Sequence, residues 1–283
     1  MLGRPLMKRL ANWIIFSWVA LLAIGAMLGA AQLHAQTLRV CADPNYLPFS
    51  NQSGQGLENK LADVTAKALG YKLEYTWASY RGPGGFDGFL YHTLNAKKCD
   101  VIMEIPYGYA QLLSTEPYYV SSYVFVYKKS KDYDIHSMDS PILRKLKIGF
   151  ESETPPEMGL KIRGLVQAAT PFQVGERAGE SPSVMLAQVQ DGTLDVVITW
   201  EPAVGYFLPR YPDLEVVAVP NERALGAPEQ YAFPVAMGVR AGDEALKKRR
   251  DEVVSKHQSQ IAAVLADFGV KLYKPNIPGV GSY

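Results

Sequence analysis

The stretch from Leu38 to Asn51 (LRVCADPNYLPFSN) constrains the fold most, because a short apolar run ends there and a polar, proline-containing segment begins. The Asp, Asn and Pro residues of this segment favour a turn over either strand or helix. Apolar residues then recur at helical spacing from Gly56 to Gly70, and Gly70 stands where a helix would end. Strand, loop and helix in this order predict an open α/β sheet, in which loops at the carboxyl ends of the strands line the ligand crevice. We therefore expect residues 43–50 to face a binding site.

Alternating and apolar runs separated by Gly and Pro continue along the rest of the chain. They predict further strands at residues 72–77, 100–105, 123–127, 146–150, 195–199 and 232–239. They predict helices at residues 89–96, from Thr154 onward with Thr154 as the cap, at 184–190, and twice within 243–267.

These elements form two α/β units joined by two extended crossings, near 123–127 and 232–239. We expect lobe 1 to comprise residues 36–125 plus 236–283 and lobe 2 to comprise residues 126–235. Chains with this arrangement commonly hinge around a cleft between the lobes.

The amino terminus differs in composition from the rest. Three basic residues precede an uncharged run from residue 10 to 31, which small residues close. A basic head, an apolar middle and a small-residue exit are typical of a secretory signal, so residues 1–35 are expected to be removed after Ala31 or Ala35. The alternative is a retained membrane anchor, since the run approaches the roughly 20 residues that a span needs. Export places the mature protein in the periplasm.

Charge and cysteine content narrow the function further. The 283 residues carry a formal net charge of +1, without basic runs interleaved with aromatics, so we expect no nucleic-acid role. The two cysteines, Cys41 and Cys99, stand at two predicted strands, and export permits a disulfide between them. The alternative is a pair of small buried apolar side chains. The chain lacks a CxxC motif and its four histidines are scattered, so we expect no metal site.

Candidate site residues lie at strand ends and in the loops after them. Glu104 stands near the carboxyl end of an apolar strand, where a carboxylate must be solvated, paired or functional. We expect a binding cleft formed by Asp43, Asn45, Phe49, Arg81, Phe86, Glu104, Tyr107, Tyr109, Tyr118, Trp200 and Glu201. The alternative for many of the aromatic side chains is a place in the hinge or the core. The carboxylates have no histidine, serine or cysteine partner at a recognisable spacing, so we expect neither catalysis nor a cofactor.

Several long motifs are similar to those of a known family. The block LSTEPYYVSSYVFVYKK, then LKIGF, DGTLDVVITW and AGDEALKKRRDEV resemble a periplasmic solute-binding protein of family 3, over nearly the whole chain from Leu38 to about Val270. The segments CADPNYLPFSNQSGQGLENKLADVTAKALG, LNAKKCDVIMEIP and DVVITWEPAVGYF more narrowly resemble the MxaJ and XoxJ type, which is associated with quinoprotein dehydrogenases. The resemblance implies a type II periplasmic binding protein fold. It also implies an accessory role, by binding, in the maturation or activation of a pyrroloquinoline-quinone (PQQ) methanol or alcohol dehydrogenase. The alternative is a transport receptor that binds a small non-amino-acid solute in the cleft for an ABC permease.

Departures from the amino-acid receptors of this family support that reading. Residues 107–113 lack the arginine that usually holds the α-carboxylate, and Trp200 follows the DVVIT strand where an acid usually holds the ammonium. Residues 153–156 (ETPP) replace a small-residue helix start, and the two prolines remove N–H groups that would bind a carboxylate. An amino acid would leave its charges unpaired, so we expect weak amino-acid binding.

Overall fold

The computed structural model describes residues 36–174, 181–224 and 227–273. The predicted signal segment, residues 1–35, lies outside this part of the chain. The helices are α2 (Leu57–Leu69), α3 (Gly85–His92), α4 (Pro155–Ile162), α5 (Ser183–Asp191), α6 (Glu201–Gly205), α7 (Glu244–Lys256) and α8 (Gln258–Asp267). The strands are β1 (Thr37–Ala42), β2 (Asn45–Tyr46), β3 (Ser50–Asn51), β4 (Lys72–Trp77), β5 (Ile102–Pro106), β6 (Leu112–Ser114), β7 (Tyr119–Lys128), β8 (Ile148–Glu151), β9 (Thr170–Phe172), β10 (Val196–Trp200), β11 (Leu214–Ala218), β12 (Glu222–Ala224), β13 (Ala227–Glu229) and β14 (Ala232–Arg240). Across the described segments, no helix combines the length and apolar character needed to cross a membrane.

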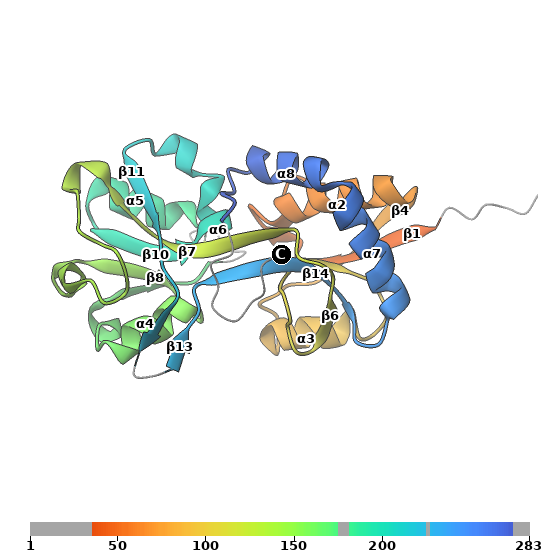
Figure 1. The fold of residues 1–283 in the computed structure, drawn as a ribbon, viewed down its shortest axis with the longest axis horizontal. Coiled ribbons are helices and arrows are strands. Elements are labelled where there is room, and N and C mark those ends of the chain that lie inside the picture. The colour runs from red at the N-terminus through yellow and green to blue at the C-terminus, as the bar shows by residue number, and fades with distance from the viewer. Residues whose placement is uncertain (1–35, 175–180, 225–226, 274–283) are drawn as a thin grey trace, which may run out of the picture. The chain divides into compact units, whose positions relative to one another are not determined.

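Two long strands, β7 and β14, belong to both halves of the fold (Figure 1). The first part of β7, from Tyr119 to Ser122, pairs antiparallel with residues 232–235 of β14. The second part of β7 pairs with β10 and β11, whereas the second part of β14 pairs with β5 and β6. Among the described residues these pairings make one eight-stranded sheet, with β7 and β14 as the two predicted crossings.

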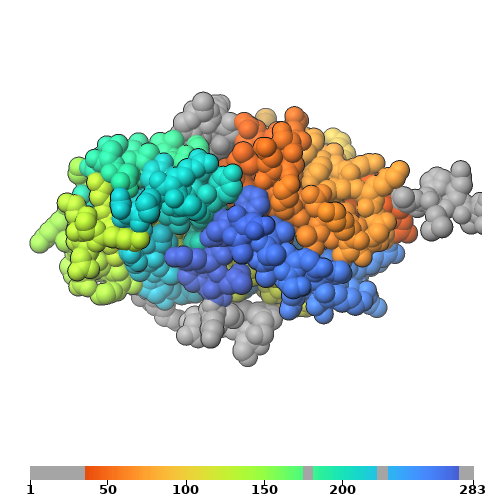
Figure 2. Space-filling view, turned by 90° about the horizontal axis from the view of Figure 1, so that it is seen from above, coloured from red at the N-terminus to blue at the C-terminus, as the bar shows by residue number. Residues whose placement is uncertain are grey.

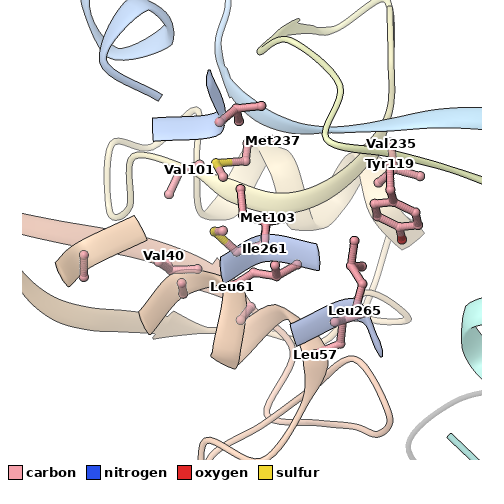
Figure 3. Packing of buried hydrophobic residues seen from close by; sticks show 14 of the residues in the cluster. Val40, Leu57, Leu61, Val101, Met103, Tyr119, Val235, Met237, Ile261 and Leu265 are labelled. Carbon is pink, nitrogen blue, oxygen red and sulfur yellow. The ribbon is translucent and has the colours of Figure 1, made fainter. Parts of the chain in front are cut away.

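Lobe 1 is built on β1 and β4, which are parallel, and on β5, which β1 approaches through a bridge between Val40 and Val101. Helices α2 and α8 cover this layer with apolar side chains (Figure 3). Leu61 of α2 and Ile261 of α8 are almost completely buried against Met237 of β14. Because these residues come from the beginning and the end of the chain, burial of apolar area ties the two ends of lobe 1 together.

Lobe 2 is built on β8, β9 and β10, which run parallel, with β7 antiparallel beside β10. Apolar clusters lie on either side of these strands, one around Phe125 and Phe150 and the other around Met185 and Val197. Parallel strands buried on both faces read as continuous apolar runs, which explains the DVVIT sequence of β10. The division of the lobes after residues 125 and 235 falls inside β7 and β14 and stays a prediction.

The predicted elements are present, with one shifted helix start and one cap that lacks its side-chain hydrogen bond. Helix α3 begins at Gly85, earlier than predicted, because Gly84 adopts a left-handed conformation (φ 82°) that starts the turn. Thr154 precedes α4, but its hydroxyl donates to the Glu151 carbonyl and does not cap the helix N–H groups. Thr154 therefore occupies the predicted cap position, but its side chain makes no capping hydrogen bond. The short strands β2, β3, β6, β9, β11, β12 and β13 were not predicted.

A disulfide joins Cys41 of β1 to Cys99, just before β5. Their Cα atoms lie 5.4 Å apart and both side chains are fully buried. The predicted pairing is confirmed, because β1 and the chain before β5 are neighbours.

The segment after α8 leaves lobe 1 and contacts lobe 2. The dark-blue residues of α8 and its extension lie between orange lobe 1 residues and cyan lobe 2 residues in Figure 2. Gly269 lies directly against Gly205 of α6 in lobe 2, and the backbone N–H of Tyr273 donates to the Val120 carbonyl of the crossing strand β7 at 3.2 Å. We call residues 268–273 the C-terminal strap, since it is a third connection between the lobes.

Candidate functional site

Two adjoining cavities lie where the two lobes meet. The inner cavity has a volume of about 530 Å³ and the outer cavity about 560 Å³. Both cavities are lined by Tyr46, Tyr80, Phe86, Glu151 and Thr154, so they form one continuous cleft. The inner cavity is further lined by Phe49, Glu58, Glu104, Ile105, Pro106, Tyr109, Tyr119, Tyr123, Pro155, Trp200, Ala203, Phe233 and Val235. The outer cavity is further lined by Ser79, Arg81, Gly82, Gly85, Ser152, Glu153 and Gln173.

Aromatic side chains make up much of the inner wall. On the lobe 1 side, Tyr46 stacks on Phe49 with ring centroids 5.1 Å apart, and Tyr80 meets Phe86 edge-on at 5.7 Å. At the crossing strands, Trp200 lies 5.1 Å from the ring of Tyr123. Ring contacts of this kind hold each side chain in place before anything binds, so the cavity is largely preformed.

Buried Asp43 organises the lobe 1 loops that carry these rings. Its carboxylate accepts hydrogen bonds from the backbone N–H groups of Asn45 at 2.9 Å and Tyr80 at 2.8 Å. The Ser50 hydroxyl donates to the Asp43 carbonyl oxygen. Asp43 therefore joins the loop after β1 to the loop after β4, and it positions Tyr80 without lining either cavity itself.

Two acidic side chains of lobe 1 reach the inner cavity. Glu58, in the first turn of α2, is only 3% exposed and accepts a hydrogen bond from the Tyr80 hydroxyl at 3.2 Å. Burial raises the pKa of Glu58 well above its usual value, and the charge of Glu104 raises it further. Glu104, in β5, accepts a hydrogen bond from the Tyr119 hydroxyl at 2.8 Å. Burial raises the pKa of Glu104 to about 7.

A third acid, Glu151, belongs to lobe 2 and lines both cavities. It stands at the carboxyl end of β8 and accepts a hydrogen bond from the Thr199 hydroxyl at 3.3 Å. Burial raises its pKa, an effect that the backbone N–H of Trp200 and the charge of Arg81 reduce. The cleft thus carries acids on both of its faces.

The start of α4 does not form an anion site. Pro155 and Pro156 occupy its first two positions, and neither has an N–H to donate. The N–H of Glu153 is bound by the Glu157 carboxylate at 2.8 Å. A ligand carboxylate at this helix end would meet proline rings and acidic side chains.

The structure brings six of the predicted cleft residues together. Phe49, Glu104, Tyr109 and Trp200 line the inner cavity, Arg81 the outer cavity, and Phe86 both. Their role in binding stays a prediction.

Five other predicted cleft residues, which are Asp43, Asn45, Tyr107, Tyr118 and Glu201, line neither cavity. Asn45 is exposed and Tyr107 is 39% exposed beyond the end of β5, while the Tyr118 hydroxyl donates to the Met103 carbonyl in lobe 1. Glu201 is completely buried and binds the C-terminal strap.

Some residues that line the inner cavity were not predicted to do so. They are Glu58, Tyr80, Tyr123, Glu151, Thr154, Pro155 and Phe233. In the sequence, Glu58 looks like an acidic residue that stabilises the N-terminus of a helix. Such residues are commonly exposed, so the pattern does not indicate a place in the cleft. Tyr123 and Phe233 lie on the crossing strands β7 and β14, and both line the inner cavity.

This fold, two α/β lobes with a cleft beside two crossing strands, is that of type II periplasmic binding proteins. No protein-family model matches the chain. The chain is 33% identical to protein MoxJ of Methylorubrum extorquens over 260 residues, which cover 85% of this chain and 83% of that protein. The chain therefore belongs to the MoxJ family.

Solved structures agree with this assignment. Periplasmic binding protein XoxJ of Methylobacterium extorquens AM1 matches with a TM-score of 0.66 and 31% identity, covering 83% of this chain and 99% of that one. MxaJ of Methylophaga aminisulfidivorans matches with a TM-score of 0.73 and 24% identity, covering 83% of this chain and 100% of that one, and supports the fold.

Proposed function

We propose that this protein is a periplasmic accessory factor of a PQQ-dependent methanol or alcohol dehydrogenase. It acts in the maturation or activation of that enzyme by binding it, without catalysing a reaction of its own. Membership of the MoxJ family supports the link to such a dehydrogenase, because the sequence resembles the subfamily associated with quinoprotein enzymes.

The composition of the inner cavity is the observation that carries this proposal. Its lining residues include nine aromatic side chains and three carboxyl groups, and none of those that the structure describes is Lys, Arg or His. Large aromatic side chains that exclude water are typical of the centres of protein interfaces. A cleft of this kind is suited to a segment of a partner protein.

A free amino acid fits this cavity poorly. Inside the inner cavity its α-carboxylate would lie among Glu58, Glu104 and Glu151, beside the proline start of α4. An unpaired charge in a desolvated site costs several kcal/mol, and three neighbouring acids increase that cost. The transport of amino acids is therefore not the role that we propose.

The experiment is titration calorimetry of the exported protein against the cofactor-free dehydrogenase of the same organism. The holoenzyme and a panel of free amino acids serve as controls. Micromolar or tighter binding to the dehydrogenase, without amino-acid binding, is expected. No heat with the dehydrogenase in either form would contradict the accessory role.

The alternative, a receptor for a small non-amino-acid solute, is favoured by the size of the cavity. A volume of about 530 Å³ lies in the range of small-molecule sites. Saturable binding of a solute, together with no binding of the dehydrogenase, would establish this alternative.

A further inference from the structure

We propose that the inner cavity receives a cationic side chain, the guanidinium or ammonium group of an arginine or lysine on the partner dehydrogenase. This inference rests on the proposed function and names the chemistry of the group that enters the cleft.

Acidic side chains from both lobes line the inner cavity. Glu58 of α2, Glu104 of β5 and Glu151 of β8 approach the cavity from three elements in two lobes. Arg81 is the only basic side chain among the described lining residues of either cavity, and it lines the outer one. A group that enters the inner cavity therefore meets acids on both faces, and Arg81, whose charge acts on Glu151, lines the outer cavity.

Glu58 and Glu104 lack the cationic partners that comparable acids have elsewhere in the described part of the chain. Glu229, also buried, is paired with Arg163 at 2.8 Å, and Asp100 is paired with Arg39 at 2.7 Å. Glu104 accepts one hydrogen bond, at Oε1, and no described residue donates to its Oε2. The inner cavity thus has open acceptor positions on a lining carboxyl group.

Glu58 adds a buried carboxyl group to this side of the cavity. One of its oxygens accepts from the Tyr80 hydroxyl, while the Ser50 hydroxyl donates to the Asp43 carbonyl. A carboxyl group that is 97% buried without a cation is costly, and a cation in the cavity would offset that cost.

Aromatic rings also line the inner cavity beside these acids. Trp200 lies between Tyr123 at 5.1 Å and Phe233 at 6.2 Å, and all three line the inner cavity. The face of an aromatic ring attracts a cation, most strongly when the pair is removed from water. Acids and rings together select for a cation with an apolar stem, which describes arginine and lysine side chains.

The outer cavity can bind the backbone of the partner segment on either side of the inserted side chain. Ser79, Ser152 and Gln173 line it together with Arg81 and Glu153, so it offers hydrogen-bonding groups of both kinds. Backbone amides that flank an inserted side chain need such groups. The shared lining of the two cavities lets one segment occupy both.

The first test compares two neutral-capped probes that differ in charge, N-acetyl-arginine amide and its urea isostere N-acetyl-citrulline amide. Calorimetry with the exported protein is expected to show at least tenfold tighter binding of the arginine probe. Glu104→Gln preserves the shape of the side chain and is expected to weaken that binding about thirty-fold or more, as loss of a buried charge partner does. Glu74→Gln, at an exposed acid on β4 of the same lobe, is the matched control and is expected to bind as the parent does.

The second test measures dehydrogenase binding with and without saturating arginine probe. Displacement of the dehydrogenase supports the inference. Equal affinity for the two probes, or unchanged affinity of the Glu104→Gln variant for the arginine probe, would overturn the inference. If the parent protein still binds the dehydrogenase in that case, the proposed function stands. Selective binding of the arginine probe by a protein that does not bind the dehydrogenase would overturn both.

Discussion

Glu201, the first residue of α6, accepts a hydrogen bond from the backbone N–H of Lys271, with N to Oε1 and N to Oε2 distances of 3.2 and 3.3 Å. These residues are 70 positions apart in sequence. The contact fastens the C-terminal strap from lobe 1 onto a helix of lobe 2, immediately after Trp200 of the inner cavity. It therefore connects the stability of the strap to the geometry of the cleft.

The close approach of Gly205 and Gly269 gives a first prediction, Gly205→Ala. A Cβ at position 205 would lie 2.7 Å from the Gly269 carbonyl oxygen, which belongs to the backbone and has little room to move. We expect a loss of about 2 kcal/mol in the free energy of unfolding, the usual range for overpacking. Urea denaturation measures it. The control, Gly82→Ala, meets its nearest atom at an ordinary 3.4 Å, and an equal effect of both changes would contradict the account.

The burial of Glu201 gives a second prediction, which concerns how the stability of the folded protein depends on pH. Burial raises its pKa to about 7, so the folded protein binds a proton more tightly than the unfolded chain, in which a glutamate titrates near 4.5. Its contribution to stability is thus fully present below about pH 4.5 and is lost as the pH rises through 7.

Replacing Glu201 tests whether this residue makes the protein less stable as the pH rises. Compared with the parent, Glu201→Gln is expected to lose less stability between pH 5 and pH 8, by on the order of 2 kcal/mol. Urea denaturation at a series of pH values measures the difference. Glu58, Glu104 and Glu151 also have raised pKa values and remain in both proteins, so the comparison isolates Glu201. Parallel pH profiles would show that Glu201 is ionised in the folded protein throughout this range.

Reduction or removal of the disulfide gives a third prediction. Cys41 and Cys99 close a loop with a sequence separation of 58. Loss of the cross-link is expected to cost about 4 kcal/mol, because the unfolded chain gains conformational freedom. The double variant Cys41→Ala/Cys99→Ala and the reduced parent should unfold at similar, lowered urea concentrations. A shift equivalent to less than about 1 kcal/mol would mean that the bond contributes little.

Trp200 gives a fourth prediction, on partner affinity. The side chain packs against Tyr123 and Phe233 and lines the inner cavity. Trp200→Ala is expected to cost about 2 kcal/mol or more in dehydrogenase affinity, as the loss of a central anchor does. Tyr91→Ala, at a tyrosine 69% exposed on α3, is the control and should leave affinity unchanged. Unchanged affinity in a folded Trp200→Ala variant would remove this residue from the site.

The sequence predicts the order of elements well because each depends on local patterns. The helix between Gly56 and Gly70 is present as α2, and Gly70 ends it in a left-handed conformation (φ 67°). The apolar runs of β8 and β10 are strands because both of their faces are buried. The disulfide could be expected because two predicted strands carry its cysteines.

The sequence predicts the cleft lining less well because the lining depends on long-range geometry. Trp200 and Glu201 are adjacent, yet Trp200 faces the cavity and Glu201 faces the strap. Glu58 lies in a helix and not after a strand, so reasoning from strand ends does not reach it. The register of β7 against β14 decides which aromatic side chains face inward, and local sequence patterns do not encode that register.

Hydrogen exchange of the exported protein, with and without the cofactor-free dehydrogenase, tests the central claim most directly. The account predicts slower exchange of backbone amides in residues 79–86 and 151–154, which line the cleft from the two lobes. It predicts no change in exposed parts of α7 on lobe 1. Protection confined to α7 or another outer surface, with both cleft segments unchanged, would contradict binding through the cleft.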